Sequence, residues 1–477
     1  MKTLHKKNRT FLAYKCAPCN ILKYKIAALL LLATIFGCDS FTEVDLPSSQ
    51  LTATDVFRDK ATATAAMTNI YTQIRTTGML SGSPQGFSNQ LGQYADELGF
   101  YSGPGSISFN FYNNALLPSG NEITDLWNNA YKQIYAANAV LEGIQGSDAL
   151  AQADRDALRG EALFVRALLH FYIGNAYGEV PYITTTDYRA NRVAPRLGDS
   201  RRHALLEQDL QEAIALLPTT DVSGQRTRPT KWASQALLAR LYLYGGKWAE
   251  ASNAASAVLN ESGLFSFGGD PETTFLKTSP STIWQLAPSV EGANTLEGAT
   301  FIFVSAPPAA TALSEDLLAA FEPGDLRRTA WVKAVSGTAG VFYHANKYKE
   351  RLASGTSKEY SVIFRLAEMY LVRAEARAKQ GEIIGAREDL NRIRAQAGLG
   401  ETAALTPNEL ALAIEKERRI ELFTEFGHRF FDLKRTDRLD AVLGAAKPGW
   451  DMSDRLLPLP QRELLLNPNL APQNPGY

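Results

Sequence analysis

The chain has 477 residues, of which 45% are hydrophobic and 21% are charged, and its formal net charge at pH 7 is −1. This length is sufficient for one large domain or two ordinary domains with a full hydrophobic core. The absence of a basic excess argues against a nucleic-acid-binding protein, which needs a positively charged stripe to displace counterions from phosphates.

The first 37 residues have the pattern of a lipoprotein signal peptide. Two lysines precede an apolar run over residues 26–36, which ends at Gly37 and Cys38. A short apolar run after basic residues is typical of a signal peptide, whereas a helix that spans a bilayer needs about 20 apolar residues. We therefore expect cleavage before Cys38, whose thiol would carry the lipid anchor. A plain secreted protein or a weak membrane anchor is the alternative.

The cysteines support the same interpretation. Cys16 and Cys19 have the spacing of a redox pair, but they lie inside the signal peptide and not at a strand-to-helix junction. With Cys38 acylated, no disulfide can form in the mature chain. Residues 38–53 are polar and acidic, and we expect them to form a flexible tether.

From residue 54 onward, apolar residues recur at helical spacing. They predict an amphipathic helix from Thr54, which is an acceptable N-cap, to about Arg75. Residues 76–120 follow as a ring-rich loop region, in which aromatic residues alternate with Gly, Ser, Asn and Gln. Further helices are predicted over about 127–141, 161–176 and 205–217.

Two later segments share the spacing of a tetratricopeptide-like helical hairpin. Gly246 is followed five residues later by Ala251, and Gly381 by Ala386. Small residues at these positions let two helices cross closely. An irregular insert over residues 262–358 separates the two hairpins.

Within this insert, turn residues separate short runs with β-strand character. These runs cover residues 282–286, 300–304 and 340–343. A helical block is predicted over 359–435. The last segment, 450–477, holds too many prolines for a helix, and we expect an ordered, extended tail.

Several segments, in this order, resemble the SusD/RagB family of outer-membrane nutrient-binding lipoproteins of Bacteroidetes. They are residues 160–167, 177–181, 365–376, 417–422, 427–435 and 473–477.

This resemblance implies one domain over residues 54–477 with a mostly α fold. Tetratricopeptide-like helical pairs would form the scaffold, and an irregular, loop-rich face with short β-strands would bind the ligand. It also implies a surface lipoprotein of the outer membrane that binds an oligosaccharide and delivers it to a SusC-like TonB-dependent transporter. A RagB-like peptide receptor is the first alternative, and a protein-binding helical scaffold or a glycoside hydrolase is a weaker one.

A glycan-binding protein of this kind needs exposed rings for the apolar faces of sugars and fixed polar groups for their hydroxyls. The ring-rich loop and the insert supply such residues. The candidates for ligand contact are Asp96, Phe100, Tyr101, Phe111, Tyr112, Trp331 and Tyr343. The alternative for each ring is that it packs the loops onto the helices.

The sequence offers little for catalysis or for a cofactor. Charged residues over 415–421 have the composition of a structural ion-pair network on a helix. No metal-binding or phosphate-binding motif is present. We therefore predict a non-catalytic protein without a cofactor, and the sequence leaves a structural calcium ion open.

Overall fold

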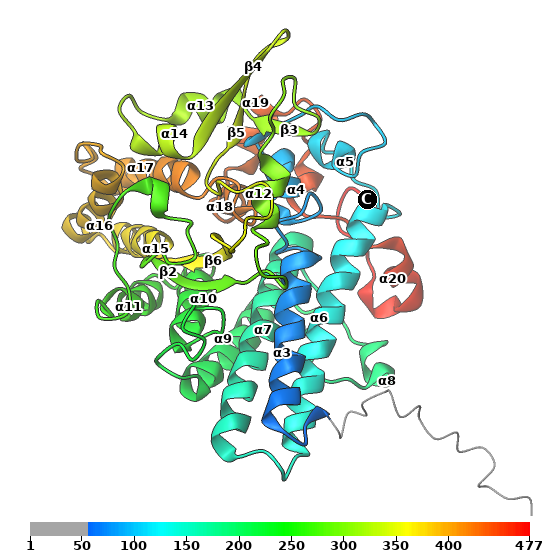
Figure 1. The fold of residues 1–477 in the computed structure, drawn as a ribbon. Helices are drawn as coiled ribbons and strands as arrows, with labels where there is room; N and C mark the ends of the chain where they lie inside the picture. Colours follow the sequence, from blue (N-terminus) through cyan, green and yellow to red (C-terminus); the bar gives the residue numbers. More distant parts are fainter. Residues whose placement is uncertain (1–55) are drawn as a thin grey trace, which may run out of the picture. The chain divides into compact units, whose positions relative to one another are not determined.

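Long helices form the scaffold in the computed structural model, which describes residues 56–477 (Figure 1). They are α3 (Lys60–Thr76), α6 (Asn121–Gln145), α7 (Gln152–Tyr177), α9 (Asp199–Leu216), α10 (Lys231–Tyr244), α11 (Trp248–Leu259), α15 (Leu366–Lys379), α16 (Ile383–Gln396) and α17 (Pro407–Glu421). Consecutive helices pack in pairs, α3 with α6, α7 with α9, α10 with α11, and α15 with α16. This arrangement confirms the predicted helical-pair scaffold.

The two predicted hairpin turns are present. Gly246 has φ +68° and Gly381 has φ +81°, a left-handed conformation that glycine adopts at a helix C-terminus without steric cost. Ala251 and Ala386 are fully buried where the second helix of each hairpin meets the first. The local sequence signal therefore identified α10–α11 and α15–α16 correctly.

The first described helix begins later than predicted. The side chain of Asp59 accepts hydrogen bonds from the backbone N–H groups of Ala61 and Thr62, and it caps α3 in this way. The predicted cap, Thr54, lies outside the described residues, as do the signal peptide, Cys38 and the tether. The apolar face of α3 is buried as its periodicity predicts.

The ring-rich loop region is only partly a loop. It contains α4 (Phe87–Tyr94), a helix in which every residue is buried, and the short helix α5 (Phe109–Tyr112). Phe87, Leu91 and Tyr94 have helical spacing, and their burial on one helix explains why this stretch does not stay extended. The prediction of a continuous loop over 76–120 was therefore wrong for these segments.

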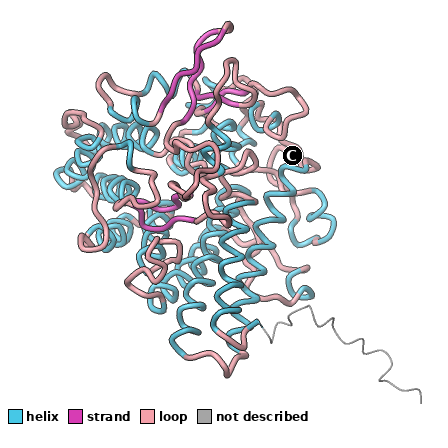
Figure 2. The backbone as a smooth tube through the Cα atoms, in the orientation of Figure 1, coloured by secondary structure: helices cyan, strands magenta, loops and turns pink. Residues whose placement is uncertain are grey.

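Strands are few and short in the described chain, as Figure 2 shows. β1 (Leu98–Phe100) pairs antiparallel with β3 (Thr311–Leu313), and β2 (Thr282–Leu286) pairs antiparallel with β6 (Ser361–Arg365). β4 (Val332–Gly337) and β5 (Gly340–Ala345) form a hairpin. The predicted strands at 282–286 and 340–343 are thus confirmed.

The third predicted strand, at 300–304, was wrong. Thr295 caps α12 (Leu296–Phe301) by accepting a hydrogen bond from the backbone N–H of Gly298, and the helix extends into the predicted strand. Phe301 packs into a second, smaller hydrophobic core beside the main helical one. A short apolar run does not by itself distinguish a strand from a buried helix.

The remaining described helices are short. They are α8 (Tyr188–Asn191), α13 (Glu315–Ala320), α14 (Leu326–Ala330), α18 (His428–Arg435), α19 (Leu439–Ala446) and α20 (Gln461–Leu466), with 3-10 turns η2 (Pro271–Thr273), η3 (Met452–Arg455) and η4 (Pro468–Leu470). Three of them, η3, α20 and η4, lie in the tail predicted to be extended. Helix α20 begins directly after Pro460 and ends before Pro468, so the prolines bound the helix instead of preventing it.

The charged segment at the end of α17 is a structural network, as predicted, but its partners lie on other elements. Arg327 on α14 contacts Glu417 at 2.6 Å and Glu421 at 2.8 Å, and Arg365 on β6 contacts Glu421 at 2.5 Å and Glu425 at 2.8 Å. Burial alone would raise the pKa of Glu421, but Arg365 and Arg327 lower it to about 2. The network joins the insert to the helical block.

Candidate functional site

Three parts of the chain that are distant in the sequence meet at one surface of the molecule: residues 87–112, strand β3 and the β4–β5 hairpin. Strand β1 pairs with β3, β3 packs against β5, and α4 contacts both β1 and α5. Figure 1 shows α5, β3 and the β4–β5 hairpin on the same side of the helical scaffold. These elements carry the partly exposed rings of Phe100, Tyr101, Phe109, Tyr112 and Phe342, which we call the aromatic platform.

The rings of the platform contact one another in two groups. Phe100 stacks on Tyr112 with ring centroids 5.5 Å apart and an interplanar angle of 24°, and it meets Phe109 edge-on at 5.8 Å. Tyr101 meets Phe342 edge-on at 5.3 Å. Phe100 and Tyr101 are adjacent in the chain but contact different rings, since Phe100 meets Tyr112 and Phe109 and Tyr101 meets Phe342.

Tyr101 is the most exposed ring of the platform, with 44% of its surface accessible. Partial burial, the phenol of Tyr112 and the carboxylate of Glu315 all raise the pKa of Tyr101. The phenol is therefore a neutral hydrogen-bond donor and acceptor at physiological pH, close to a second phenol and a carboxylate.

A lysine packs against one ring of the platform. The ammonium of Lys447, directly after α19, lies 3.9 Å from the ring centroid of Tyr112 and donates a 2.7 Å hydrogen bond to the carbonyl of Gln93. Burial lowers the pKa of Lys447 to about 8, although Asp96 opposes this shift. A cation held against a ring face fixes the orientation of that ring.

Asp96 belongs to the framework of this region. It is buried, and its carboxylate accepts two 2.8 Å hydrogen bonds from Arg429, with Arg419 at 2.9 Å. The charge of Asp96 is thereby neutralised within the protein. Asp96 therefore has a structural role, because arginines engage both of its oxygens, and it also lines an open pocket, so its contact with a ligand stays a prediction.

The structure also corrects the prediction for Phe111 and Trp331, which are both buried. Phe111 packs edge-on against Tyr94 in the main core, because it faces inward from α5. Trp331 lies in the second core, where it packs against Phe275 and donates a 2.8 Å hydrogen bond to the carbonyl of Pro271. Neither ring is accessible to a ligand.

Tyr343 is half-buried and lies on the other side of its strand from the platform. It packs against the second core, under the guanidinium of Arg328 at 4.8 Å. The neighbouring residue, Phe342, is the one that reaches Tyr101, because side chains alternate along a strand. Sequence reasoning found the strand but not the residue that faces the platform.

Phe109 and Phe342 complete the platform and were absent from the predicted site. Phe109 could have been predicted from the high density of aromatic residues around it in the sequence. Phe342 could have been predicted from the alternation of side-chain directions along the strand, but only if the neighbours of that strand were known.

The arrangement suits the stacking of a flat ligand face on the rings. Flat, partly exposed rings offer large apolar area at a small cost in side-chain entropy, and the phenols at their edge can donate and accept hydrogen bonds. Glu97, the acidic neighbour of Asp96, is buried, and burial raises its pKa to about 7.

Within residues 56–477, no group of three or more His, Cys, Asp or Glu side chains is placed to hold a metal ion, and no helix is long and apolar enough to cross a membrane.

Comparison with known proteins adds independent information. A family model described as "Starch-binding associating with outer membrane" matches residues 41–243, and a second, described as "SusD family", matches residues 337–477. SusD-like protein P2 of Formosa agariphila is 28% identical, over 95% of this chain and 100% of its own length. SusD-like protein P25 of the same organism is 23% identical, over 96% of this chain and 99% of its own.

Solved structures share the fold. A SusD superfamily protein from Bacteroides vulgatus superposes with a TM-score of 0.77 at 20% identity, covering 88% of this chain and 99% of the other. A laminarin-binding SusD-like protein superposes with a TM-score of 0.71 at 24% identity, covering 87% of this chain and 99% of the other. The chain therefore shares its fold with these proteins.

Proposed function

The chain belongs to the SusD family, and from that premise we propose that it is a glycan receptor of the outer membrane. It captures an oligosaccharide on the aromatic platform and releases it unchanged. The observation that carries this proposal is the convergence of five partly exposed rings from three separate segments on one surface. A solved relative with this fold is described as laminarin-binding, which supports a glycan as the ligand class.

Binding without hydrolysis is supported by the state of the acidic pair beside the platform. A glycoside hydrolase needs two carboxyl groups about 5 to 9 Å apart that face the substrate. Asp96 is locked to Arg429 and Glu97 is buried, so this acidic pair beside the platform is committed to the fold. The proposed binding needs no cofactor.

The delivery step and the anchor extend the same proposal. A receptor of this family would pass its ligand to a SusC-like TonB-dependent transporter and would be held at the outer membrane by a lipid on Cys38, facing the extracellular side. Recovery of such a transporter with the purified protein from outer membranes tests the partner. Loss of palmitate incorporation in a Cys38→Ala variant tests the anchor, and retained incorporation would refute it.

The ligand class is tested by calorimetric titration of the purified protein with laminarin, starch, other plant and bacterial polysaccharides, and a peptide library. The platform variant, Tyr101→Ala with Tyr112→Ala, should bind the best glycan at least tenfold more weakly, about 1.4 kcal/mol. Val341→Ala is the matched control, since Val341 is 52% exposed on the same hairpin but is not part of the platform.

Unchanged affinity in the platform variant would refute the platform as the binding surface. Binding to peptides and to no glycan would refute the glycan class and favour a peptide receptor. The melting temperature of each variant is measured beside its affinity, so that loss of binding through unfolding is recognised.

A further inference from the structure

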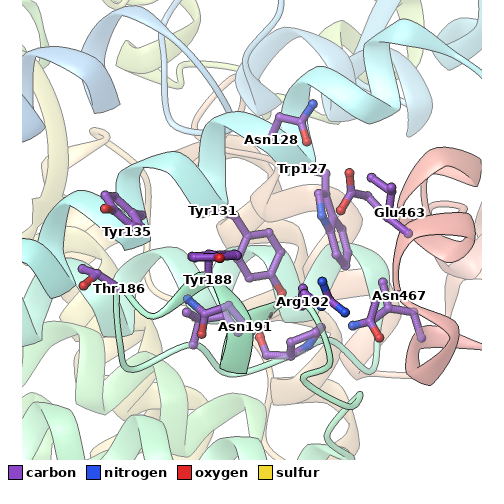
Figure 3. Close-up of a pocket in the computed structure, with 14 residues that line it drawn as sticks. Trp127, Asn128, Tyr131, Tyr135, Thr186, Tyr188, Asn191, Arg192, Glu463 and Asn467 are labelled. Atoms are coloured by element: carbon purple, nitrogen blue, oxygen red, sulfur yellow. Dashed lines mark hydrogen bonds between the residues drawn. The ribbon is translucent and has the colours of Figure 1, made fainter. Parts of the chain in front are cut away.

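A second ring-lined site lies away from the platform, between α6, α8 and α20. It is an open pocket of about 380 Å³, shown in Figure 3. This volume falls in the range of about 300 to 1,000 Å³ that is usual for small-ligand sites. None of its lining residues belongs to the aromatic platform.

Four aromatic side chains form much of the wall of this pocket. Trp127 and Tyr131 come from α6 and pack with ring centroids 4.8 Å apart. Tyr131 is fixed because its hydroxyl donates a 2.9 Å hydrogen bond to the carbonyl of Pro181. Tyr135, on α6, and Tyr188, on α8, remain 51% and 66% exposed at the pocket. The wall thus combines a rigid, buried part with an accessible one.

The pocket also contains polar groups. Trp127 is only 3% exposed, and its side chain makes no hydrogen bond to another residue of 56–477, so its indole N–H is open to the pocket. The half-buried carboxylate of Glu463 and the exposed guanidinium of Arg192 also line the pocket. Figure 3 shows Trp127, Arg192 and Glu463 around one space.

We propose that this pocket is a second saccharide site, which holds one or two sugar units. A sugar presents apolar C–H faces to the rings, and its hydroxyls can both donate to Glu463 and accept from Trp127 and Arg192. This inference rests on the proposed glycan-binding function and adds a second point of contact to it.

The two other ligand classes that ring-lined pockets bind fit less well. A quaternary ammonium suits an aromatic cage, but it cannot accept a hydrogen bond from Trp127, and Arg192 repels it. An anion would pair with Arg192 but would meet the carboxylate of Glu463. A neutral polyhydroxyl ligand satisfies all three groups at once.

Two sites on one protein have a measurable consequence. A polysaccharide long enough to reach both sites binds the second one intramolecularly, at a high effective concentration. A short oligosaccharide occupies the two sites independently. The intact protein should therefore bind two equivalents of a short oligosaccharide and hold the parent polysaccharide more tightly.

The test uses laminarin oligosaccharides of two to three units, or short fragments of whichever polysaccharide binds in the titrations above. The pocket variant carries Tyr188→Ala with Glu463→Gln, and Glu463→Gln alone serves if the double variant melts early. Arg201→Ala is the control, since Arg201 is an exposed arginine on α9 outside the pocket lining. Calorimetry gives the number of sites and their affinities.

We expect two equivalents for the intact protein and the Arg201 control, one for the pocket variant, one for the platform variant, and none when both are combined. A pocket variant that still binds two equivalents would overturn the second site. One equivalent that is lost only in the pocket variant would refute the platform and keep this pocket. Binding of tetramethylammonium in the pocket, in place of sugar, would overturn the ligand class, and no glycan binding at all would overturn both proposals.

Discussion

The buried acid in front of strand β1 makes the stability of the protein depend on pH. One oxygen of Glu97 accepts a long hydrogen bond of 3.4 Å from the backbone N–H of Thr424, and the other has no partner among the described residues. Burial, followed by the charge of Asp96, raises the pKa of Glu97 from 4.5 to about 7, against the opposing effects of Arg429 and Lys347. The folded protein therefore holds a proton that the unfolded chain releases.

The size and sign of the effect follow from this difference. Between pH 4.5 and 7 the folded state binds more protons than the unfolded state, so the free energy of unfolding falls as the pH rises. One pKa unit corresponds to about 1.4 kcal/mol, and the shift of Glu97 to about 7 therefore corresponds to about 3 kcal/mol. The full contribution is present below pH 4.5 and is lost by pH 8.

A Glu97→Gln variant tests this reasoning, because glutamine imitates the protonated acid at every pH. Urea unfolding is measured for the intact protein and the variant at pH 4.5, 6, 7 and 8. The free energy of unfolding of the variant, minus that of the intact protein, should rise by about 3 kcal/mol from pH 4.5 to pH 8. Glu315→Gln, at an exposed acid on α13, is the control. A difference that does not change with pH would refute a protonated Glu97.

Two further substitutions test the scaffold. Arg240→Met should destabilise the protein by about 3 to 5 kcal/mol, because it leaves the buried carboxylate of Glu368 without the guanidinium that binds it at 2.5 and 2.7 Å. In urea unfolding, the double variant with Glu368→Leu should recover much of this lost stability. An equal loss in the single and the double variant would contradict the explanation. Gly427→Ala should lower the melting temperature more than Gly224→Ala. Both glycines have positive φ, but only at Gly427 would an added Cβ lie 2.5 Å from the side chain of Leu91. Equal shifts of the melting temperature in the two variants would show that this close contact is unimportant.

The features that could be predicted from the sequence are those with local causes. A glycine that ends a helix, followed by an alanine where the next helix crosses, specifies α10–α11 and α15–α16 without reference to the rest of the chain. The spacing of apolar residues similarly predicts the buried face of α3. Such signals depend on residues within one or two turns of each other.

The composition of the platform could not be predicted because it depends on distant contacts. Whether Phe342 or Tyr343 faces Tyr101 is decided by the packing of β5 against β3. Trp331 looks like an accessible tryptophan in the sequence, but a second core, built partly from Phe423, encloses it. A ring in a loop-like sequence does not reveal which neighbours will cover it.

The pocket beside α6 illustrates the same limit. In the sequence, Trp127 and Tyr131 have the spacing of an ordinary buried helix face. They line a pocket because α20, from the end of the chain, approaches α6 and leaves space in front of the rings. The short helix α20 was itself absent from the prediction.

The ion pair between Asp96 and Arg429 joins residues 333 positions apart, and this separation sets the order in which a newly made molecule becomes able to bind. Synthesis proceeds from the N-terminus, so Phe100 to Tyr112 emerge long before Arg429 and Lys447 exist. Until then the buried acid has no cation and the ring of Tyr112 has no support. Long-range contacts of this kind slow folding, because the loop that they close costs entropy. The aromatic platform is therefore complete only after the C-terminal residues that support it have been made.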